Sequence, residues 1–199
     1  MTGLAKGTPW WVGPLWLAPS MVPALWLRLP LWGLVAIGTW FFRDPDRTPE
    51  GPGLLAPADG VVREVSTRTD GGVVVSTYLD LFDVHVTRAP CDGVVVGQQH
   101  HRGSHRAAFR PKSHLNERVE WRLETGLGDV RLVQIAGAIA RRIVPYTGTS
   151  EAVGRGERIG LIRYGSRVDV VFPAGVLPSV SEGERVSAGA TVIARVSGS

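Results

Sequence analysis

Cysteine and lysine are scarce in this chain, and their scarcity argues against two kinds of chemistry. Cys91 is the only cysteine among 199 residues, so no internal disulfide can form, and we expect a small buried thiol in a reducing compartment. Lys6 and Lys112 are the only lysines. Pyridoxal phosphate is held on a lysine, and Lys112 stands in a polar stretch without a glycine-rich phosphate motif that opens a helix. A pyridoxal enzyme is therefore not expected.

Patterns for metal binding and nucleic-acid binding are also missing. His100, His101 and His105 lie close together, but no carboxylate or cysteine joins them at ligand spacing, so no metal is predicted. The net charge of +4 comes almost wholly from arginine. The basic residues are scattered, and the most basic stretch, 102–112, holds one aromatic residue, which is a poor match to a nucleic-acid surface. An anionic membrane surface explains the charge more economically.

An apolar, tryptophan-rich segment lies near the amino terminus. Between Trp10 and Phe42 the only charged residue is Arg28. Six of the seven tryptophans of the chain lie in this stretch: Trp10, Trp11, Trp16, Trp26, Trp32 and Trp40. Tryptophan is favoured where hydrocarbon meets the headgroup layer, and the small-residue cleavage site of a secretory signal does not follow. We therefore predict that residues 1–42 form an apolar helical membrane anchor.

The length of this segment limits how it can meet a bilayer. Arg28 divides it into 18 residues with three prolines, 10–27, and 14 residues, 29–42. As a straight helix the second piece reaches about 21 Å, short of a hydrocarbon core of about 30 Å. A helical hairpin with Arg28 at its tip, or an interfacial re-entrant anchor, would leave the rest of the chain on the cytoplasmic side of the cell membrane. A buried pair of core helices is the alternative.

Beyond a linker at 49–53, short β segments follow one another between glycines and prolines. Most of them alternate apolar and polar residues or are rich in valine. The predicted strands are 60–65, 72–78, 85–88, 93–98, 117–123, 129–135, 140–145, 158–164, 167–172 and 191–196. The fold class is therefore mainly β, with residues 43–199 as one domain.

Two internal repeats place a turn before a strand. Ala56–Val62 recurs as Ala89–Val95, and Gly156–Ile159 recurs as Gly183–Val186. Such paired units suit a rolled β domain similar to the barrel-sandwich hybrid of lipoyl and biotinyl carrier domains. A non-enzymatic, membrane-anchored carrier or adaptor domain is therefore an alternative. Neither repeat holds the lysine that carrier domains modify, and the long helical hairpin of an adaptor is absent, which weakens this alternative.

A glycine-serine bond lies between an apolar run, 159–162, and an alternating strand, 168–172. The hydroxyl of Ser166 can attack the carbonyl of Gly165, because glycine has no Cβ to obstruct the approach. An N-to-O acyl shift would give an ester. β-Elimination and hydrolysis would then release ammonia and leave a pyruvoyl group at the new amino end. Because Gly-Ser is common in turns, the surrounding motifs decide whether this chemistry applies.

Short motifs occur in a fixed order up to and across this bond. They are Phe41–Pro45, Ala56–Gly60, Phe82–Pro90, Asn116–Arg118, Gln134–Gly137, Ile139–Ile143 and Gly165–Val170. The ordered set, which covers about 41–173, resembles the short bacterial and archaeal form of phosphatidylserine decarboxylase. The resemblance implies a proenzyme that cuts itself into chains 1–165 and 166–199. These chains would stay together as a heterodimer, and a higher oligomer is left open.

The resemblance also implies the reaction. Phosphatidylserine would form a Schiff base with the pyruvoyl group made from Ser166, lose CO₂ and be released as phosphatidylethanolamine. The covalent pyruvoyl group is then the only cofactor, and a phospholipid in the membrane is the partner. A serine phospholipid with isoprenoid tails is an alternative substrate, because the headgroup chemistry is the same.

Candidate site residues follow from the motifs. The resemblance implies an acid from an Asp-Gly turn for self-cleavage, and Asp59 occupies that position, although the repeat at Asp92 shows that such turns need no function. His85 is the candidate general acid/base, which would take the Ser166 proton and later protonate the substrate carbon. Longer family members carry a second histidine where this chain has Arg88, so either His85 serves both steps or another group replaces the missing histidine during self-cleavage. Arg88 could instead steer an anionic headgroup.

Two further arginines and one short family signature complete the set of predicted site residues. Arg141 and Arg142 flank an apolar strand, where they would either bind a phosphodiester or simply edge the sheet. Asn116–Arg118 matches a signature of the family, and the resemblance implies that this signature organises the wall of the substrate pocket. Whether the side chains of this signature touch substrate is left open.

Overall fold

The computed structural model describes residues 3–103, 116–137, 142–163 and 166–198. The chain separates into two compact units, Met1–Asp46 and Arg47–Ser199. The boundary predicted from the sequence, between residues 42 and 43, precedes this division by four residues. Arg43 and Asp44 belong to the first unit, where they form a short strand.

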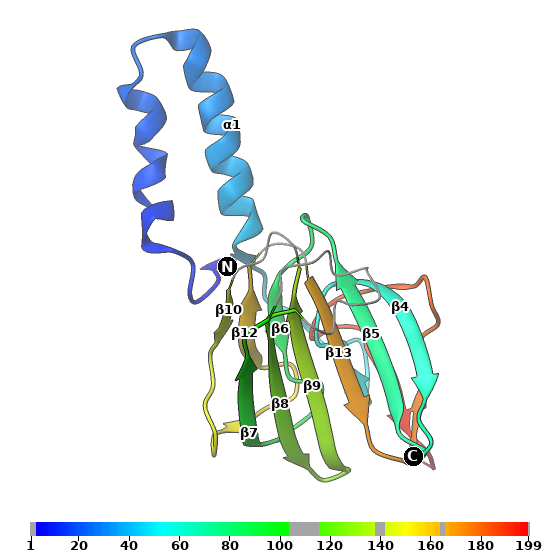
Figure 1. Ribbon diagram of the computed structural model, residues 1–199. Coiled ribbons are helices and arrows are strands. Elements are labelled where there is room, and N and C mark those ends of the chain that lie inside the picture. The colour runs from blue at the N-terminus through cyan, green and yellow to red at the C-terminus, as the bar shows by residue number, and fades with distance from the viewer. Residues whose placement is uncertain (1–2, 104–115, 138–141, 164–165, 199) are drawn as a thin grey trace. The chain divides into compact units, whose positions relative to one another are not determined.

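The first unit is a hairpin of helical turns with a two-stranded ribbon at its base (Figure 1). Its elements are β1 (Gly3–Leu4), the 3₁₀ helices η1 (Trp10–Val12), η2 (Pro14–Trp16) and η3 (Ala18–Met21), α1 (Leu25–Phe41) and β2 (Arg43–Asp44). The arms meet at Trp16, whose ring centroid lies 5.4 Å from that of Trp32 and whose Nε1 donates to Thr39 Oγ1 at 3.0 Å. Pro14 and Pro19 lack a backbone donor, so the first arm winds as short 3₁₀ turns.

The tip of the hairpin lies at Val22–Ala24, so the prediction that Arg28 forms the tip is wrong. Val22 precedes Pro23 and is extended, with ψ 122°, which is the conformation that a following proline favours. Arg28 lies inside α1, and its Nε donates to the carbonyl of Val22 at 2.7 Å. A proline therefore sets the tip. None of the helices in the described ranges combines the length and the apolarity that crossing a bilayer requires.

The second unit is dominated by a curled antiparallel sheet of eight strands (Figure 1). Their order across the sheet is β11-β7-β8-β9-β13-β5-β4-β15. The bounds are β4 (Gly60–Thr67), β5 (Val73–Leu79), β7 (Gly93–His101), β8 (Arg118–Thr125), β9 (Gly128–Ala136), β11 (Ala152–Val153), β13 (Ser166–Phe172) and β15 (Arg185–Val186). The mainly β fold is confirmed. The closer likeness to a barrel-sandwich hybrid stays a prediction.

Two smaller antiparallel sheets complete the second unit. One has the order β10-β12-β6 and the other the order β14-β16-β3. Their bounds are β3 (Leu54–Leu55), β6 (Val86–Arg88), β10 (Ile143–Pro145), β12 (Arg158–Ile162), β14 (Val176–Pro178) and β16 (Val192–Val196). The sheet of β6 and β12 lies next to two candidate residues in the chain, because His85 directly precedes β6 and β12 ends four residues before Ser166.

All ten strands predicted from the sequence are present, and within the described residues their ends differ by at most three residues. Residues 140, 141 and 164 of the predicted strands lie outside the described residues. The sequence missed strands of two or three residues, namely β1, β2, β3, β11, β14 and β15. Such short strands contain too few residues for an alternating pattern to show. They form because a neighbouring long strand offers backbone donors and acceptors at its edge.

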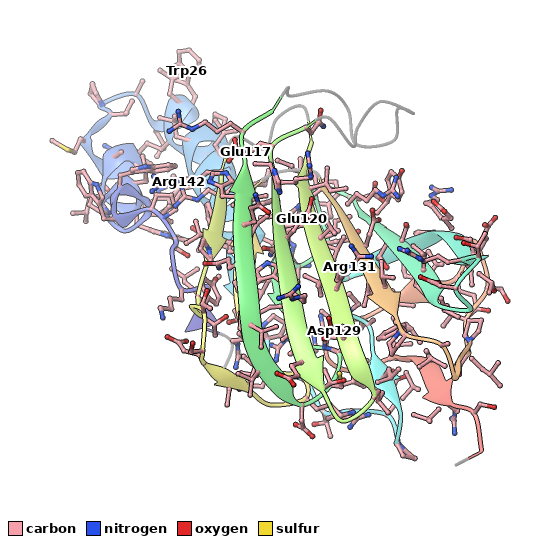
Figure 2. The ribbon with its side chains drawn as sticks, turned by 60° about the horizontal axis from the view of Figure 1, so that its bottom comes forward. Trp26, Glu117, Glu120, Asp129, Arg131 and Arg142 are labelled. Atoms are coloured by element: carbon pink, nitrogen blue, oxygen red, sulfur yellow. The ribbon has the colours of Figure 1, made fainter. Side chains whose placement is uncertain are left out.

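The alternation of side chains explains how the large sheet divides a core from a surface. On β13 Val168, Val170 and Phe172 are buried on the inner face, while Arg167 and Asp169 lie on the outer face. Figure 2 shows the outer face of β8 and β9, where charged side chains such as Glu120 and Arg131 project away from the core. The apolar residues at every second position therefore close the interior in which Ser166 lies.

The turn before β4 requires glycine. Gly60 has φ +141°, and a Cβ added there would lie 2.1 Å from the carbonyl oxygen of Tyr78. Only glycine adopts this backbone without strain. Because the preceding residue is Asp59, the same tight turn fixes the direction of the candidate carboxylate.

Candidate active site

Ser166 is the first residue of the central strand β13. It pairs with Leu79 of β5 on one side and with Ala136 of β9 on the other. Its side chain is 1% exposed, and Oγ has no hydrogen-bond partner in the described part of the chain. A buried hydroxyl without a partner is costly, at about 1–3 kcal/mol. A buried group of this kind calls for an explanation, and a reactive role is one. Gly165, the other half of the predicted cleavage bond, lies outside the described residues.

His85 is fully buried next to β6, and its tautomer follows from one hydrogen bond. Nδ1 lies 2.9 Å from the backbone carbonyl oxygen of Asp83. Because a carbonyl only accepts, Nδ1 carries the hydrogen of the neutral ring, and the lone pair is on Nε2. Nε2 is therefore the atom that can accept a proton.

The segment that carries His85 is fixed at two points. The backbone carbonyl of His85 accepts from the backbone N–H of Ile162 at 3.1 Å, and Ile162 precedes Ser166 by four residues. The Asp83 carboxylate accepts from Arg185 Nη1 at 2.7 Å and from the backbone N–H of Asp80 at 2.8 Å. These bonds hold His85 beside the stretch of chain that enters the cleavage bond, although no hydrogen bond joins its side chain to Ser166 in the described ranges.

Asp59 is a buried carboxylate with three donors around it, one guanidinium and two backbone N–H groups. Oδ2 accepts from Arg47 Nη2 at 2.8 Å, and Oδ1 accepts from the backbone N–H of Ala188 at 2.7 Å. Burial raises the pKa of Asp59, and this outweighs the lowering by Ala188, by the Arg47 charge and by the backbone N–H of Val84. Since Val84 directly precedes His85, the structure brings Asp59 to the His85 segment.

The repeat copy of this turn has a different environment. Asp92 is exposed, and its Oδ1 accepts from the backbone N–H of Arg155 at 2.7 Å. Asp92 therefore serves turn geometry at the surface, whereas Asp59 is enclosed beside Arg47. The two copies share a backbone turn and differ in what their carboxylates can do.

The predicted substrate-binding arginines lie in different surroundings. Arg88 is almost fully buried, and its Nη1 donates to the carbonyl of Gly156 at 3.1 Å. A Cβ at Gly189 would lie 2.5 Å from Arg88 Cδ, so this side chain passes closely over a glycine turn. Arg142 is exposed, and its backbone carbonyl accepts from the N–H of Arg163 at 3.2 Å, three residues before Ser166. Arg141 lies outside the described residues.

Asn116 is fully buried beside Ser166 and has a clear structural contact. Its Nδ2 donates to the carbonyl of Ala136 at 2.8 Å, and Ala136 is a direct cross-strand neighbour of Ser166. The expectation that the signature Asn116–Arg118 organises the wall of the substrate pocket stays a prediction. Thr87 and Trp121, which contact Gln134 in the same interior, were not singled out from the sequence, because isolated core threonines and tryptophans carry no pattern.

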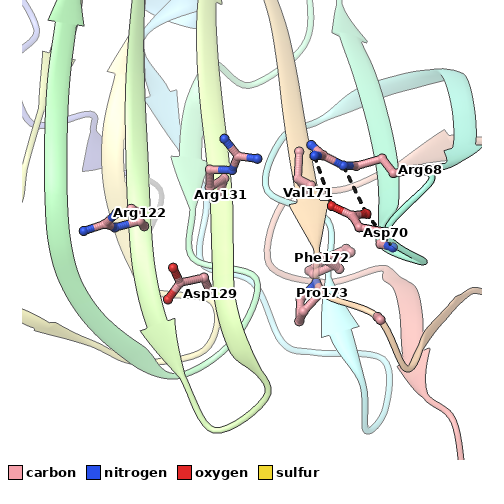
Figure 3. A pocket seen from close by; sticks show the side chains of 10 residues that line it. Arg68, Asp70, Arg122, Asp129, Arg131, Val171, Phe172 and Pro173 are labelled. Atoms are coloured by element: carbon pink, nitrogen blue, oxygen red, sulfur yellow. Dashed lines mark hydrogen bonds and ion pairs between the residues drawn. The ribbon is translucent and has the colours of Figure 1, made fainter.

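Two other features of the second unit lie apart from Ser166. His100 and His101 pair with Glu117 and Glu120 at 3.0 and 3.5 Å, and the described ranges contain no group of side chains suited to hold a metal ion. A groove of about 390 Å³, shown in Figure 3, is lined by Arg68, Asp70, Arg122, Asp129, Arg131 and the end of β13. It lies at Phe172, and about six residues of extended strand, or roughly 20 Å, separate it from Ser166. The groove is therefore separate from the candidate reaction centre.

Comparisons with known proteins agree on one family. A family model described as phosphatidylserine decarboxylase matches residues 34–194. The phosphatidylserine decarboxylase proenzyme of Thermobifida fusca (strain YX) is 48% identical over 169 residues, which cover 85% of this chain and 78% of that protein. A protein of Halobacterium salinarum, a putative archaetidylserine decarboxylase proenzyme, is 45% identical over 201 residues, which cover 96% of this chain and 100% of that protein.

Similarity of this extent defines the class of protein: the chain is a carboxy-lyase of the kind that is made as a proenzyme. It belongs to the phosphatidylserine decarboxylase family. The resemblance found from the motifs is therefore confirmed, and the carrier or adaptor alternative is not supported.

Proposed function

We propose that the chain cuts itself between Gly165 and Ser166 and, once cut, converts phosphatidylserine to phosphatidylethanolamine and CO₂. The observation that carries this proposal is the Ser166 hydroxyl, which is buried without a partner at the start of the central strand. A pyruvoyl group made from Ser166 would supply an electrophilic ketone for the substrate amine and an acceptor for the electrons that decarboxylation releases. The residues around it would then bind, orient and exchange protons.

Self-cleavage needs a base for the Ser166 hydroxyl. His85 Nε2 has the lone pair, because Nδ1 donates to Asp83, so Nε2 accepts the hydroxyl proton as Oγ attacks the Gly165 carbonyl carbon. The Gly165–Ser166 C–N bond breaks, and the nitrogen takes up a proton. Asp59 lies beside the His85 segment and supports the charge that the ring gains, because an adjacent carboxylate favours a protonated imidazole.

Decarboxylation needs the same nitrogen as a proton donor. After self-cleavage, the carbon that loses CO₂ carries an electron pair and needs a proton, and His85 Nε2 can deliver it once the ring is protonated. The interior around Ser166 consists mainly of aliphatic residues such as Leu79, Ala136 and Val168. A carboxylate held in apolar surroundings loses the solvation that opposes its departure as CO₂.

Cut chains would remain associated through the sheet. β13 pairs along its length with β5 on one side and along most of its length with β9 on the other. A strand that is hydrogen-bonded on both sides and buried on its inner face does not leave a folded sheet. The proposed mature form is therefore a heterodimer of residues 1–165 and 166–199.

The first unit is proposed to lie at the membrane interface as an anchor, with the catalytic domain on the cytoplasmic side. Its exposed apolar side chains include Trp10 at 84%, Met21 at 83% and Trp26 at 74%, a density unusual for a surface in water. The Arg43 guanidinium lies 4.4 Å from the Trp40 ring centroid. A cation stacked on tryptophan suits the level of anionic headgroups. The substrate would then be met within its own bilayer.

The cleavage proposal is tested by intact mass. The wild-type chain should give two masses that sum to about the 21.4 kDa of the precursor, with the smaller chain blocked by a ketone. Ser166→Ala should give one uncut chain without decarboxylase activity. Cutting elsewhere in the wild type, or activity from uncut Ser166→Ala, would overturn the proposal. Assays with acyl-tailed and isoprenoid-tailed serine phospholipids test the alternative substrate. The Halobacterium salinarum relative, named as a putative archaetidylserine decarboxylase proenzyme, is the reason to include the second lipid.

The anchor proposal is tested by flotation with vesicles that contain anionic phospholipid. The triple variant Trp10→Ser, Met21→Ser and Trp26→Ser should release most of the protein from the vesicles, because the apolar contact area is lost. Leu177→Ser removes an exposed apolar side chain from the second unit and serves as the matched control. Equal binding by the triple variant and the control would contradict the interfacial anchor.

A further inference from the structure

Three buried side chains form a short chain of hydrogen bonds through the interior. Trp121 Nε1 donates to Gln134 Oε1 at 2.9 Å, and Gln134 Nε2 donates to Thr87 Oγ1 at 2.9 Å. None of the three is more than 1% exposed. The carboxamide of Gln134 therefore has one bond at its oxygen and one at its nitrogen, and it cannot rotate without losing both.

The second bond joins the two sheets that carry the proposed reaction centre. Gln134 lies on β9 opposite Val168 of β13, two residues along from the pair of Ala136 and Ser166. Side chains two residues apart on a strand share a face, so Gln134 lies on the same face as Ala136, the cross-strand partner of Ser166. Thr87 lies on β6, two residues along the chain from His85, which directly precedes that strand. The bond from Gln134 to Thr87 thus spans from the Ser166 side of the interior to the His85 side.

A glycine makes room for this bond. Gly160 of β12 is the direct cross-strand partner of Thr87. A Cβ added to Gly160 would lie 2.9 Å from Gln134 Nε2 and 3.3 Å from Gln134 Oε1. Any larger residue at this position would push the carboxamide away from Thr87.

We propose that Gln134 is a positioning residue, which holds His85 at its working distance from Ser166 through Thr87. The inference rests on the proposed role of His85. Apolar packing is non-directional and would leave β6 free to shift by a fraction of an ångström, whereas a buried hydrogen bond accepts only a narrow range of distance and angle. A displacement of about 1 Å of a catalytic group can cost about 100-fold in rate. An apolar core of the same shape would be about as stable, so the polar chain serves placement.

The test compares two variants that break different ends of the hydrogen-bond chain. Thr87→Val removes the link to β6. Trp121→Phe leaves that link and orphans the other end of Gln134, at a comparable or larger loss of stability. Self-cleavage is followed on denaturing gels after cell-free synthesis of the full chain, and the melting temperature is measured on the same proteins. Thr87→Val should slow self-cleavage by about 10- to 100-fold. Trp121→Phe should slow it by no more than about threefold, with an equal or greater fall in melting temperature.

Three further variants sharpen the result. Thr87→Ser keeps the hydroxyl and should restore the rate. Thr77→Val is the matched control, because Thr77 is a buried core threonine opposite Val168 whose Oγ1 has no hydrogen-bond partner in the described part of the chain. It should cleave normally and be at least as stable as wild type. Gly160→Ala displaces the carboxamide without removing any of its partners, and it should slow self-cleavage even if Thr87→Val fails to fold.

The outcomes separate this inference from the proposed function. In processed enzyme, Thr87→Val should lower kcat with KM nearly unchanged, because the change affects proton transfer and not lipid binding. If the rate of self-cleavage falls in proportion to the melting temperature in both Thr87→Val and Trp121→Phe, the role is structural and the inference is overturned. Normal rates of self-cleavage for both Thr87→Val and Gly160→Ala would also overturn it. Normal cleavage and turnover by His85→Ala would instead overturn the role of His85 itself.

Discussion

Cys91 gives a quantitative test of how closed the catalytic domain is. Burial raises the pKa of its thiol from 9.0 to about 11, with a smaller raising effect of the Asp92 charge and an opposing effect of Arg155. Iodoacetamide reacts with the thiolate. At pH 8 the thiolate fraction is about 10% for a pKa near 9 and about 0.1% for a pKa near 11, so ionisation alone should make alkylation of the folded chain about 100-fold slower than alkylation of the unfolded chain.

The assay measures the alkylation rate by intact mass as a function of pH, with and without urea. In urea the rate should level off above about pH 9, whereas without urea it should keep rising about tenfold per pH unit to about pH 11. Similar rates in the two conditions at pH 8 would refute the burial of Cys91 and with it the packing of the turn at 89–92.

The same shift makes the free energy of unfolding depend on pH. The folded thiol keeps its proton to higher pH than the unfolded one. Its stabilising contribution is therefore complete below the unfolded pKa of 9.0 and is lost as the pH rises through about 11. The loss is on the order of 3 kcal/mol for a rise of this size. Urea unfolding of wild type and Cys91→Ala should show a constant difference below about pH 9 that moves in favour of the variant above it. A flat difference up to about pH 11 would contradict this assignment.

Three further substitutions test the site. Gly60→Ala should destabilise the domain by several kcal/mol and slow self-cleavage, since its Cβ would meet the Tyr78 carbonyl at 2.1 Å; normal melting and cleavage would contradict the tight turn. Arg47→Ala should cost about 3 kcal/mol near neutral pH and less near pH 4, because burial already raises the pKa of Asp59 and the ionised carboxylate loses its cation; urea unfolding at the two pH values checks the sign, and an equal loss at both would count against it. His85→Ala should abolish decarboxylation, and full turnover by a cleaved His85→Ala enzyme would reject its role.

Local sequence patterns were enough to predict most of the strands. The long strands alternate and are rich in valine, so β4, β5, β7, β8, β9 and β13 follow from the sequence. The tip of the apolar hairpin was not predicted correctly. The charge of Arg28 suggested a tip at that residue, whereas the backbone restriction that Pro23 imposes on Val22 sets the tip. The two-residue strands depend on the neighbours they pair with, which no local pattern reveals.

For the candidate site, the sequence predicted which residues take part but not what surrounds them. Ser166, His85 and Asp59 stand in motifs with a chemical meaning, and the sequence was enough to select them as candidates. What it could not provide is their environment. The burial of Arg88 against Gly189, the pairing of Asp59 with Arg47 and the bond from Gln134 to Thr87 join segments that are far apart in the chain. Contacts of this kind depend on how sheets pack, so they were accessible only from the structure.

The position of β13 in the middle of the large sheet has a consequence for unfolding. The proposed short product, residues 166–199, contributes that central strand together with β14, β15 and β16. The precursor can refold as a single molecule, but the processed enzyme would have to reassemble from two, at a rate that depends on concentration. Since the peptide bond is not remade, heat inactivation of the working enzyme should be a one-way process, and its lifetime should be set by the unfolding barrier.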